Sequence, residues 1–465
     1  MRGADTPAAA ATLAGLDRDP HPLLAAMRAA GPVCWVPALG AWLVTGYQCA
    51  VDVLRDARTF TVDDPRFSTA KVVGPSMLSL DGARHARHRA PFSRAFRSEE
   101  VHARLASFTQ AEAGRLVSAI APRGEAELRR AVAGPLAAAV MAEALGLSDA
   151  DPAQILAWYD GIVAAVQAEA ALQAQAALRA DAAGQAGTAA FAGLAASLRE
   201  VIATAGHRSL LAAAVATPEA TPEATQETGP PLTEDEVISN AAVLMFGGIE
   251  TTEGMIANAA LHLLTHPGEL DLVRTDPGLI PAAIEESLRL EPAAAVVDRY
   301  ATADALLGGV RIPAGEQVTV SIAAANRDPA VFADPDRYEV RRANASRHLA
   351  FAHGPHFCLG AHLARLEARI AIETLLDQLP ALRLDDRFTA APRGLVFRKP
   401  PEMLVRWNLR LKMGTGVSAG GASGPRFPAG SGRRRSGGCT ARRTSRAARR
   451  RRCRSATSAG STVPG

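Results

Sequence analysis

The ten residues FAHGPHFCLG, at positions 351–360, decide the fold of this chain, because they set one cysteine in a loop directly ahead of a long amphipathic helix. Backbone N–H groups and the positive end of the helix dipole favour a thiolate at Cys358. In a close-fitting loop such a thiolate is a metal ligand or a nucleophile, but an isolated cysteine is more often a buried small residue. The helix is indicated by apolar residues at spacings of four, three and four, namely Leu359, Leu363, Leu366 and Ile370.

The composition favours a helical protein with a large core. Of the 465 residues, 48% are hydrophobic and only 5% are aromatic, and good helix formers such as Ala, Leu, Arg and Glu dominate. The five cysteines are too few and too scattered for a disulfide framework. No apolar run is long enough to span a bilayer, and the N-terminal segment lacks the apolar centre of a signal peptide. We therefore expect a cytoplasmic protein without membrane contact.

The net charge is divided unevenly along the chain. The formal charge is +4 overall, but residues 413–465 hold twelve arginines, no lysine and no acidic residue, which leaves −8 on residues 1–412. This tail has few apolar residues, so we expect it to be disordered. A basic arm can bind nucleic acid, but the tail lacks interleaved aromatic residues for base stacking. We read it as a dispensable extension and expect no nucleic-acid partner.

Periodicity predicts a mainly α-helical fold with small β-sheets. A short helix and alternating strand-like stretches occupy residues 20–60, and helical patterns dominate residues 81–215. The Pro-containing repeat TPEATPEATQETGPP at 217–231 excludes regular helix, so we expect it to be a loop inside one domain spanning residues 15–410. Strand patterns return at 296–322 and in the later stretches LVFRKP and MLVRW.

The longest predicted helix runs from Thr233, which forms a possible capping box with Glu236, to His266. At about 32 residues it would be roughly 48 Å long, enough to cross a domain. Its centre, FGGIETT at 246–252, contains two glycines that each cost about 1 kcal/mol relative to Ala. Paired helical glycines usually mark close packing, but here an acid and a hydroxyl follow at once.

The cysteine loop, the glycine–acid–threonine helix and a Glu-x-x-Arg pair together resemble bacterial cytochromes P-450, the haem-thiolate monooxygenases. The family's loop, Phe-Gly-x-Gly-x-His-x-Cys-x-Gly, matches positions 351–360 except at Ala352, which we expect to be tolerated only if its φ angle is negative. The implied fold places the long helix over the haem, with Cys358 as the axial thiolate on iron. Three further loop residues would support the haem, namely Phe351, His356 and Gly360.

The same resemblance implies roles for residues elsewhere in the chain. Gly247 and Gly248 would make room for dioxygen. Glu250 and Thr251 would form the acid–alcohol pair that delivers protons, since cleaving the O–O bond to release water takes two protons. With His356, the groups that hold the haem propionates would be His85, Arg89 and Arg299. A structural triad without chemistry would lock the haem-side coil, namely Glu286, Arg289 and Arg337.

The implied activity is monooxygenation, in which one oxygen atom from O2 enters a small apolar organic substrate by hydroxylation or epoxidation, in bacterial secondary metabolism. The cofactor would be haem b. The chain has no flavin or nicotinamide domain, so electrons from NAD(P)H would arrive through a ferredoxin reductase and a ferredoxin. Cations such as Arg94 and Arg97 would dock an acidic ferredoxin. We expect a monomer.

Two other functions remain open from the sequence. A haem-thiolate protein can also be a peroxide-driven enzyme or catalyse oxidative coupling. The intact pair Glu250 and Thr251 disfavours a peroxide-driven enzyme, because such an enzyme has no need of imported protons. The pair does not exclude an oxidative coupling enzyme. A non-enzymatic metal-binding protein would use the cysteine loop as a zinc site, but this leaves the glycine-containing helix unexplained. Its ligands would be His353, His356, Cys358 and His362.

The substrate pocket is less specific than the haem site. In this family it is lined by the loop at 60–80, the helices around 155–205, the long helix near 243–251 and residues 293–297. The small apolar residues at these positions suggest a roomy pocket suited to a terpenoid, a polyketide or a similar molecule. They are Met77, Leu78, Val243, Leu244, Ala294, Ala295, Val296 and Val297.

Overall fold

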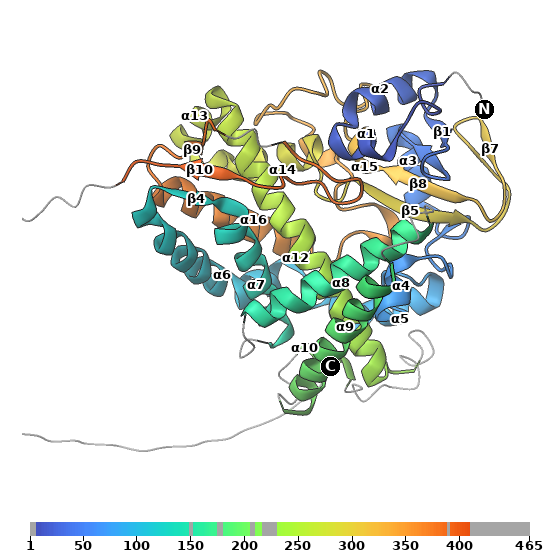
Figure 1. Ribbon diagram of the computed structural model, residues 1–465, viewed down its shortest axis with the longest axis horizontal. Helices are drawn as coiled ribbons and strands as arrows, with labels where there is room; N and C mark the ends of the chain where they lie inside the picture. Colours follow the sequence, from blue (N-terminus) through green and yellow to red (C-terminus); the bar gives the residue numbers. More distant parts are fainter. Residues whose placement is uncertain are drawn as a thin grey trace, which may run out of the picture. The chain divides into compact units, whose positions relative to one another are not determined.

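The computed structural model describes residues 6–147, 152–173, 180–204, 210–215, 230–387 and 391–409. These residues fold mainly into helices with small β-sheets, as the sequence predicted (Figure 1). Most of the repeat at 217–231 and the tail at 413–465 lie outside the described residues. Among the described helices, none is long and apolar enough to cross a membrane.

A five-stranded sheet is built from β1 (Val33–Val36), β2 (Ala41–Val44), β3 (Phe60–Thr61), β5 (Val296–Ala301) and β8 (Gln317–Ser321). Their order is β1-β2-β8-β5-β3, with β2 parallel to β8 and the other neighbours antiparallel. The sheet therefore joins the N-terminal strands to the later β segments that the sequence predicted. In β5, Arg299 pairs with Val318 of the neighbouring strand, which holds this arginine within the sheet.

Two smaller sheets are formed by β4 (Glu125–Glu127), β9 (Arg383–Leu384) and β10 (Leu404–Arg406), and by the hairpin of β6 (Ala305–Leu307) and β7 (Val310–Ile312). The stretch MLVRW contains β10, as predicted. The stretch LVFRKP does not form a strand and makes only isolated bridges, Ala294 with Phe397 and Arg393 with Lys399. β4 and β9 were not predicted, because strands of two or three residues are too short to show a periodicity.

The helices of the first half are α1 (Leu13–Arg18), α2 (His21–Ala30), α3 (Tyr47–Arg55), α4 (Ser68–Val73), α5 (Gly82–Ser93), α6 (Ser98–Ile120), α7 (Gly134–Leu145), α8 (Pro152–Gln173), α9 (Ala180–Thr204) and α10 (Leu210–Val215). Those of the second half are α12 (Glu234–Thr265), α13 (Pro267–Thr275), α14 (Ile280–Leu290), α15 (Ile322–Ala325) and α16 (Ala361–Gln378). α5 continues through Pro91 to Ser93.

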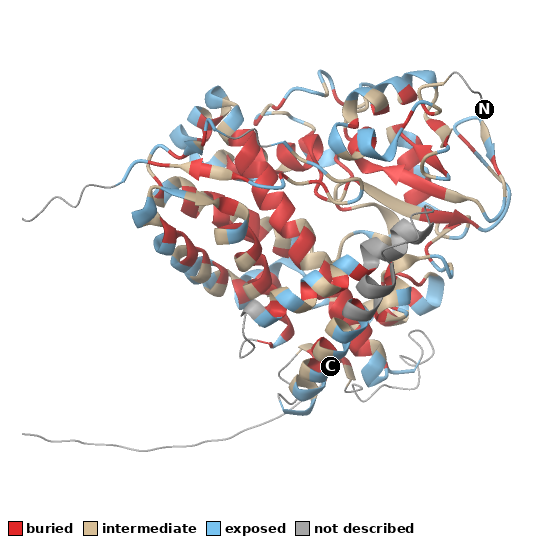
Figure 2. Ribbon diagram, in the orientation of Figure 1, coloured by how far each residue is buried: buried red, intermediate tan, exposed pale blue. Residues whose placement is uncertain are grey.

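The long helix predicted from the sequence is α12, and both its length of 32 residues and its capping box are confirmed. The side chain of Thr233 accepts from the N–H of Glu236, and the Glu236 carboxylate accepts from the N–H of Thr233. α12 packs against α7, α14 and α16, and it is buried along most of its length (Figure 2). A helix that is apolar on all sides is stable only when it is enclosed, which explains its central position.

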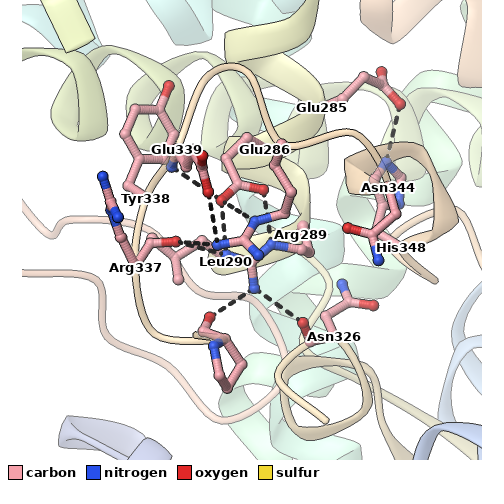
Figure 3. A network of polar contacts seen from close by, with 12 residues as sticks. Glu285, Glu286, Arg289, Leu290, Asn326, Arg337, Tyr338, Glu339, Asn344 and His348 are labelled. Atoms are coloured by element: carbon pink, nitrogen blue, oxygen red, sulfur yellow. Dashed lines mark hydrogen bonds and ion pairs between the residues drawn. The ribbon is translucent and has the colours of Figure 1, made fainter. Parts of the chain in front are cut away.

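A buried ion cluster fixes the coil that follows α15 on the way to the cysteine loop (Figure 3). Glu286 and Arg289 are both 0% exposed, and their two parallel hydrogen bonds measure 2.7 and 2.8 Å. The same guanidinium donates to the backbone carbonyls of Asn326, Pro335 and Arg337. Since a buried charge without its partners is very costly, the cluster ties this coil firmly to α14.

The third side chain of this cluster is Arg342, so the prediction of Arg337 was wrong. Arg342 Nε donates to Glu286 Oε1 at 2.9 Å. The side chain of Arg337 is exposed, and only its carbonyl oxygen takes part, accepting from Arg289 and Arg342. The neighbouring Tyr338 is 2% exposed and takes the inward position, which turns Arg337 toward solvent. Two nearby arginines cannot be told apart by spacing alone.

We expect Arg342→Ala to lower the free energy of unfolding by about 2–3 kcal/mol, because it removes a charge-assisted hydrogen bond to a buried carboxylate. Arg337→Ala is the matched control. It deletes an exposed side chain but keeps the accepting carbonyl, so its effect should stay within about 0.5 kcal/mol. Chemical denaturation of the two variants measures both values, and equal effects would contradict the assignment of Arg342.

Candidate active site

The cysteine loop presents Cys358 just ahead of α16. Residues Gly354–His356 form one 3₁₀ turn, and the N–H of Cys358 donates to the carbonyl of Phe351 at 2.8 Å, which closes the loop. Phe351 is largely buried, and the guanidinium of Arg365 lies 4.4 Å from the centre of its ring. Phe351 and Cys358 therefore lie in one closed loop, and a role of the Phe351 ring beside the sulfur stays a prediction.

Opposing effects act on the ionisation of Cys358. Burial raises the pKa of the Cys358 thiol, and the opposing effects of the Gly360 N–H, Arg89 and Arg365 are smaller. The Gly360 N–H at the start of the helix thus does favour the thiolate, while loss of hydration acts against it. A thiolate at Cys358 stays a prediction.

The residue that departs from the family's loop adopts an unfavourable backbone conformation. Ala352 has a φ angle of 58°, so the expectation of a negative φ was wrong. Its N–H donates to the carbonyl of Leu349 at 2.8 Å, and Gly354, two residues on, also has a positive φ of 72°. The loop thus requires left-handed backbone at position 352, where an L-residue with a Cβ atom costs roughly 1–2 kcal/mol.

We expect Ala352→Gly to raise the free energy of unfolding by about 1 kcal/mol, because Gly adopts a positive φ without steric cost. Ala350→Gly is the matched control, because Ala350 is not among the residues with positive φ. It should lower the same free energy by about 0.5–1 kcal/mol through the greater freedom of the unfolded chain. Denaturant unfolding tests the opposite signs, and two changes of the same sign would contradict the strained conformation of Ala352.

The side chains predicted to hold propionates gather around Asp81 and the cysteine loop. His356 Nε2 lies 2.7 Å from Asp81 Oδ1, and the rings of His85 and His356 are 4.3 Å apart. Arg89 Nη2 donates to the carbonyl of Phe357 at 2.6 Å. Although burial opposes ionisation of Asp81, hydrogen bonds from His356 and from Thr61 and Val62 hold its pKa at about 2. Asp81 is an additional member of the site that the sequence prediction missed.

Two of these groups lack the partners that their burial demands. His85 Nε2 is inaccessible to solvent and has no hydrogen-bond partner, and burial lowers the pKa of His85 to about 4. Arg299 is 5% exposed and donates to the carbonyl of Asp298 at 2.7 Å, but no carboxylate in the described part of the chain pairs with it. Burial lowers its pKa to about 10. An unpaired buried guanidinium is costly, so this wall fits an anionic group.

The two glycines of α12 have different surroundings. A Cβ atom built on Gly247 meets nothing within 4 Å, whereas one on Gly248 would lie 2.1 Å from Cε of Met141 on α7. The absence of a side chain at Gly247 therefore leaves open space, but at Gly248 it also allows close helix packing. The hydroxyl of Thr251 donates to the carbonyl of Gly247 at 2.6 Å. The Thr251 hydroxyl is therefore engaged in a hydrogen bond within α12, one helical turn from the open space at Gly247.

The predicted acid–alcohol pair does not form a direct contact in this structure. Glu250 is 6% exposed and its carboxylate lies 2.9 Å from the Lys399 ammonium, while Thr251 bonds within α12. Lys399 also pairs with Glu253, which binds Arg129. This cluster was not predicted, because Lys399 lies far along the chain in the segment expected to be a strand. A joint role of Glu250 and Thr251 remains a prediction.

One cavity of about 1220 Å³ brings these elements together. Its wall includes Cys358, Gly247, Thr251, Arg299 and His356. None of the described side chains of α8 and α9 lines it, contrary to the expectation for 155–205, because these two helices pack mainly against each other. All eight of the apolar residues predicted for the substrate pocket do line it, namely Met77, Leu78, Val243, Leu244, Ala294, Ala295, Val296 and Val297.

The zinc site considered from composition has no counterpart in the described residues, which contain no group of three or more His, Cys, Asp or Glu side chains able to hold a metal ion. His353 accepts instead from Arg55 Nε at 2.7 Å, and His356 pairs with Asp81. The histidines of the loop therefore face separate partners.

Comparisons with known proteins point to one family. A profile described as cytochrome P-450 matches residues 277–403. The chain is 36% identical over 422 residues to the cytochrome P-450 monooxygenase PikC of Streptomyces venezuelae, covering 87% of this chain and 94% of PikC. It is 34% identical over 380 residues to the mycinamicin IV hydroxylase/epoxidase of Micromonospora griseorubida, covering 79% and 89%. The crystal structure of P450BioI in complex with an acyl carrier protein ligated with hexadec-9Z-enoic acid has a TM-score of 0.74 at 30% identity, covering 84% of this chain and 98% of that chain.

The chain therefore belongs to the cytochrome P-450 family, and it is a haem-dependent monooxygenase that uses O2 and electrons. Its residues fit the cofactor that the family implies. A cysteine lies on the cavity wall, Gly247 leaves open space, and the unpaired Arg299 and His85 Nε2 match the carboxylates that a haem carries.

Proposed function

We propose that Cys358 would ligate the iron of haem b bound in the cavity that Cys358 and α12 line. The observation that carries the proposal is the composition of one cavity wall, where Cys358, the open position at Gly247 and the buried Arg299 occur together. When bound, haem supplies the redox chemistry that activates O2, and electron donation from the thiolate favours O–O cleavage.

The surrounding residues hold and orient this group. Arg299 and Arg89 neutralise the propionates, and His85 and His356 donate hydrogen bonds to them. Phe351 and Gly360 hold the loop backbone closely around the Cys358 sulfur. Gly247 and Gly248, on α12, leave room for dioxygen. Thr251 and Glu250 supply protons on the α12 side, which for Glu250 requires release from Lys399.

The cavity favours a largely apolar substrate. Its α12 wall carries Val243 and Leu244, and the segment after α14 contributes the run Ala294–Val297. Small aliphatic side chains exclude water and select for apolar area rather than for a particular polar group. We propose hydroxylation or epoxidation of a terpenoid, a polyketide or a similar product of secondary metabolism.

Electrons originate from NAD(P)H and arrive through a ferredoxin reductase and a ferredoxin. Arg94 follows the last residue of α5 and Arg97 precedes α6, and both are exposed. The side chain of Arg94 is 82% accessible and lies 3.3 Å from Glu100. Rim charges of this kind mainly speed the encounter with an oppositely charged partner, so an acidic ferredoxin fits this surface.

Carbon monoxide binding to the reduced, haem-loaded protein tests the ligand. The absorption band diagnostic of thiolate ligation should appear in the wild type and be lost in Cys358→Ala. Cys49→Ala is the control, because Cys49 is buried in the separate core around the five-stranded sheet, and it should keep the band. A wild-type-like spectrum of Cys358→Ala would overturn the proposed ligand.

Turnover assays test the electron source and separate monooxygenation from peroxide-driven chemistry. Reduced ferredoxin with O2 should support product formation, whereas hydrogen peroxide alone should support much less.

The double variant Arg94→Glu/Arg97→Glu should weaken ferredoxin binding by about 5- to 30-fold, equivalent to roughly 1–2 kcal/mol for two rim charges at low salt. Arg311→Glu, on the exposed β6–β7 hairpin, is the control and should bind as the wild type does. Unchanged binding of the double variant would exclude this docking surface.

A further inference from the structure

The two central glycines of α12 face the cavity in different ways. In the middle of this helix, from residue 237 to residue 263, every residue is buried except Gly247, Gly248 and Thr251, and these three line the cavity. The space that a Cβ atom on Gly247 would take is open, since it meets nothing within 4 Å. The corresponding space at Gly248 is filled by the side chain of Met141 on α7. The helix therefore presents one open notch and one filled notch to the same cavity.

Met141 reaches Gly248 with the whole end of its side chain. A Cβ atom on Gly248 would lie 2.1 Å from Cε, 3.4 Å from Sδ and 3.6 Å from Cγ of Met141. The residues three and four positions away on α7 include Ala137 and Ala144, both buried, so small side chains surround this one long side chain on the helix face. Met141 is 3% exposed, and within α7, which the structure describes throughout, it is the only residue that lines the cavity.

The two notches also differ in polarity. The Thr251 hydroxyl lies at the Gly247 notch, where it donates to the Gly247 carbonyl at 2.6 Å. The Gly248 notch is closed by a methyl group and a thioether, which form no strong hydrogen bonds. Methionine is unbranched and flexible, so its end adapts to the irregular space that a missing side chain leaves. Of the two notches, only the one at Gly247 has space for a diatomic molecule.

We propose that Met141 is a positioning residue for dioxygen, because it fills the space beside Gly248 and confines dioxygen to the space beside Gly247, next to the Thr251 hydroxyl. The inference rests on the proposed function, in which both glycines leave room for dioxygen, and it restricts this role to Gly247. Holding a reactant in one place increases the share of turnovers in which the reacting atoms are correctly oriented. Met141 takes no part in the chemistry itself.

The first test measures melting temperatures of the haem-loaded protein and does not depend on activity. Alanine is favoured over glycine inside a helix, so Gly248→Ala should raise the melting temperature in the Met141→Ala background, where the added methyl group has space. In the wild type it should not, because the methyl group overlaps with the end of Met141.

Gly114→Ala is the matched control for this test. Gly114 lies inside α6, and a Cβ atom on it meets nothing within 4 Å. Its replacement should therefore raise the melting temperature equally in the wild-type and Met141→Ala backgrounds. An equal effect of Gly248→Ala in the two backgrounds would contradict the contact and overturn the proposal.

The second test uses carbon monoxide as a diatomic probe in the reduced, haem-loaded protein. After a light flash releases the carbon monoxide, Met141→Ala should show a rebinding phase that the wild type lacks, because the molecule can occupy the apolar space beside Gly248. Apolar cavities of this kind bind xenon, so xenon should remove this phase. Met141→Leu nearly conserves the side-chain volume, so it should show no such phase.

Met245→Ala is the matched control for the second test. Met245 is a buried methionine of α12 that is 0% exposed and does not line the cavity, so its removal should produce no xenon-sensitive phase. With ferredoxin and O2, Met141→Ala should form about twofold less product per electron consumed, as expected if dioxygen divides between two positions. The conservative Met141→Leu should recover this coupling, and Met245→Ala should keep it.

Three results would overturn the proposal while leaving the monooxygenase function in place. They are the absence of a xenon-sensitive phase in Met141→Ala, an equal phase in Met245→Ala, and unchanged coupling in Met141→Ala. Absence of the band diagnostic of thiolate ligation in the wild type would overturn the proposed function itself and this inference with it.

Discussion

The geometry of the site depends on the buried ion cluster of Glu286, Arg289 and Arg342. Because both members of the central pair are fully buried, neither can be released without leaving a charge in the interior. The cluster holds the coil after α15 by its backbone carbonyls, and that coil leads into the cysteine loop. The sulfur of Cys358 is thereby kept opposite α12 without a disulfide, and a deep cavity remains between two parts of the chain that are remote in sequence.

Local signals were sufficient to predict the long helices and the strands of residues 296–322 but not β4 or β9, and the resemblance was sufficient to predict eight apolar residues of the cavity wall. An unbroken apolar pattern with a capping box predicts α12. Residue types that must occur at fixed spacing predict the loop around Cys358. The eight apolar wall residues could be predicted because the order of motifs fixes the fold. These features depend on neighbours in the sequence or on the family as a whole.

The errors concern contacts that no local pattern encodes. Arg337 and Arg342 are equivalent by spacing, and only the inward turn of Tyr338 decides between them. The positive φ of Ala352 follows from a hydrogen bond to Leu349 and not from residue type. The ion pair of Lys399 with Glu250 arises from packing between distant segments. The burial that raises the pKa of the Cys358 thiol is likewise not visible in the sequence.

The unpaired Arg299 and the orphaned nitrogen of His85 make assembly of the enzyme sensitive to porphyrin supply. A polypeptide made before haem is available would keep the buried Arg299 guanidinium without an anionic partner beside the apolar cavity. Its native state would therefore be less populated than that of the haem-bound protein. Binding of the cofactor should therefore raise the free energy of unfolding of the protein.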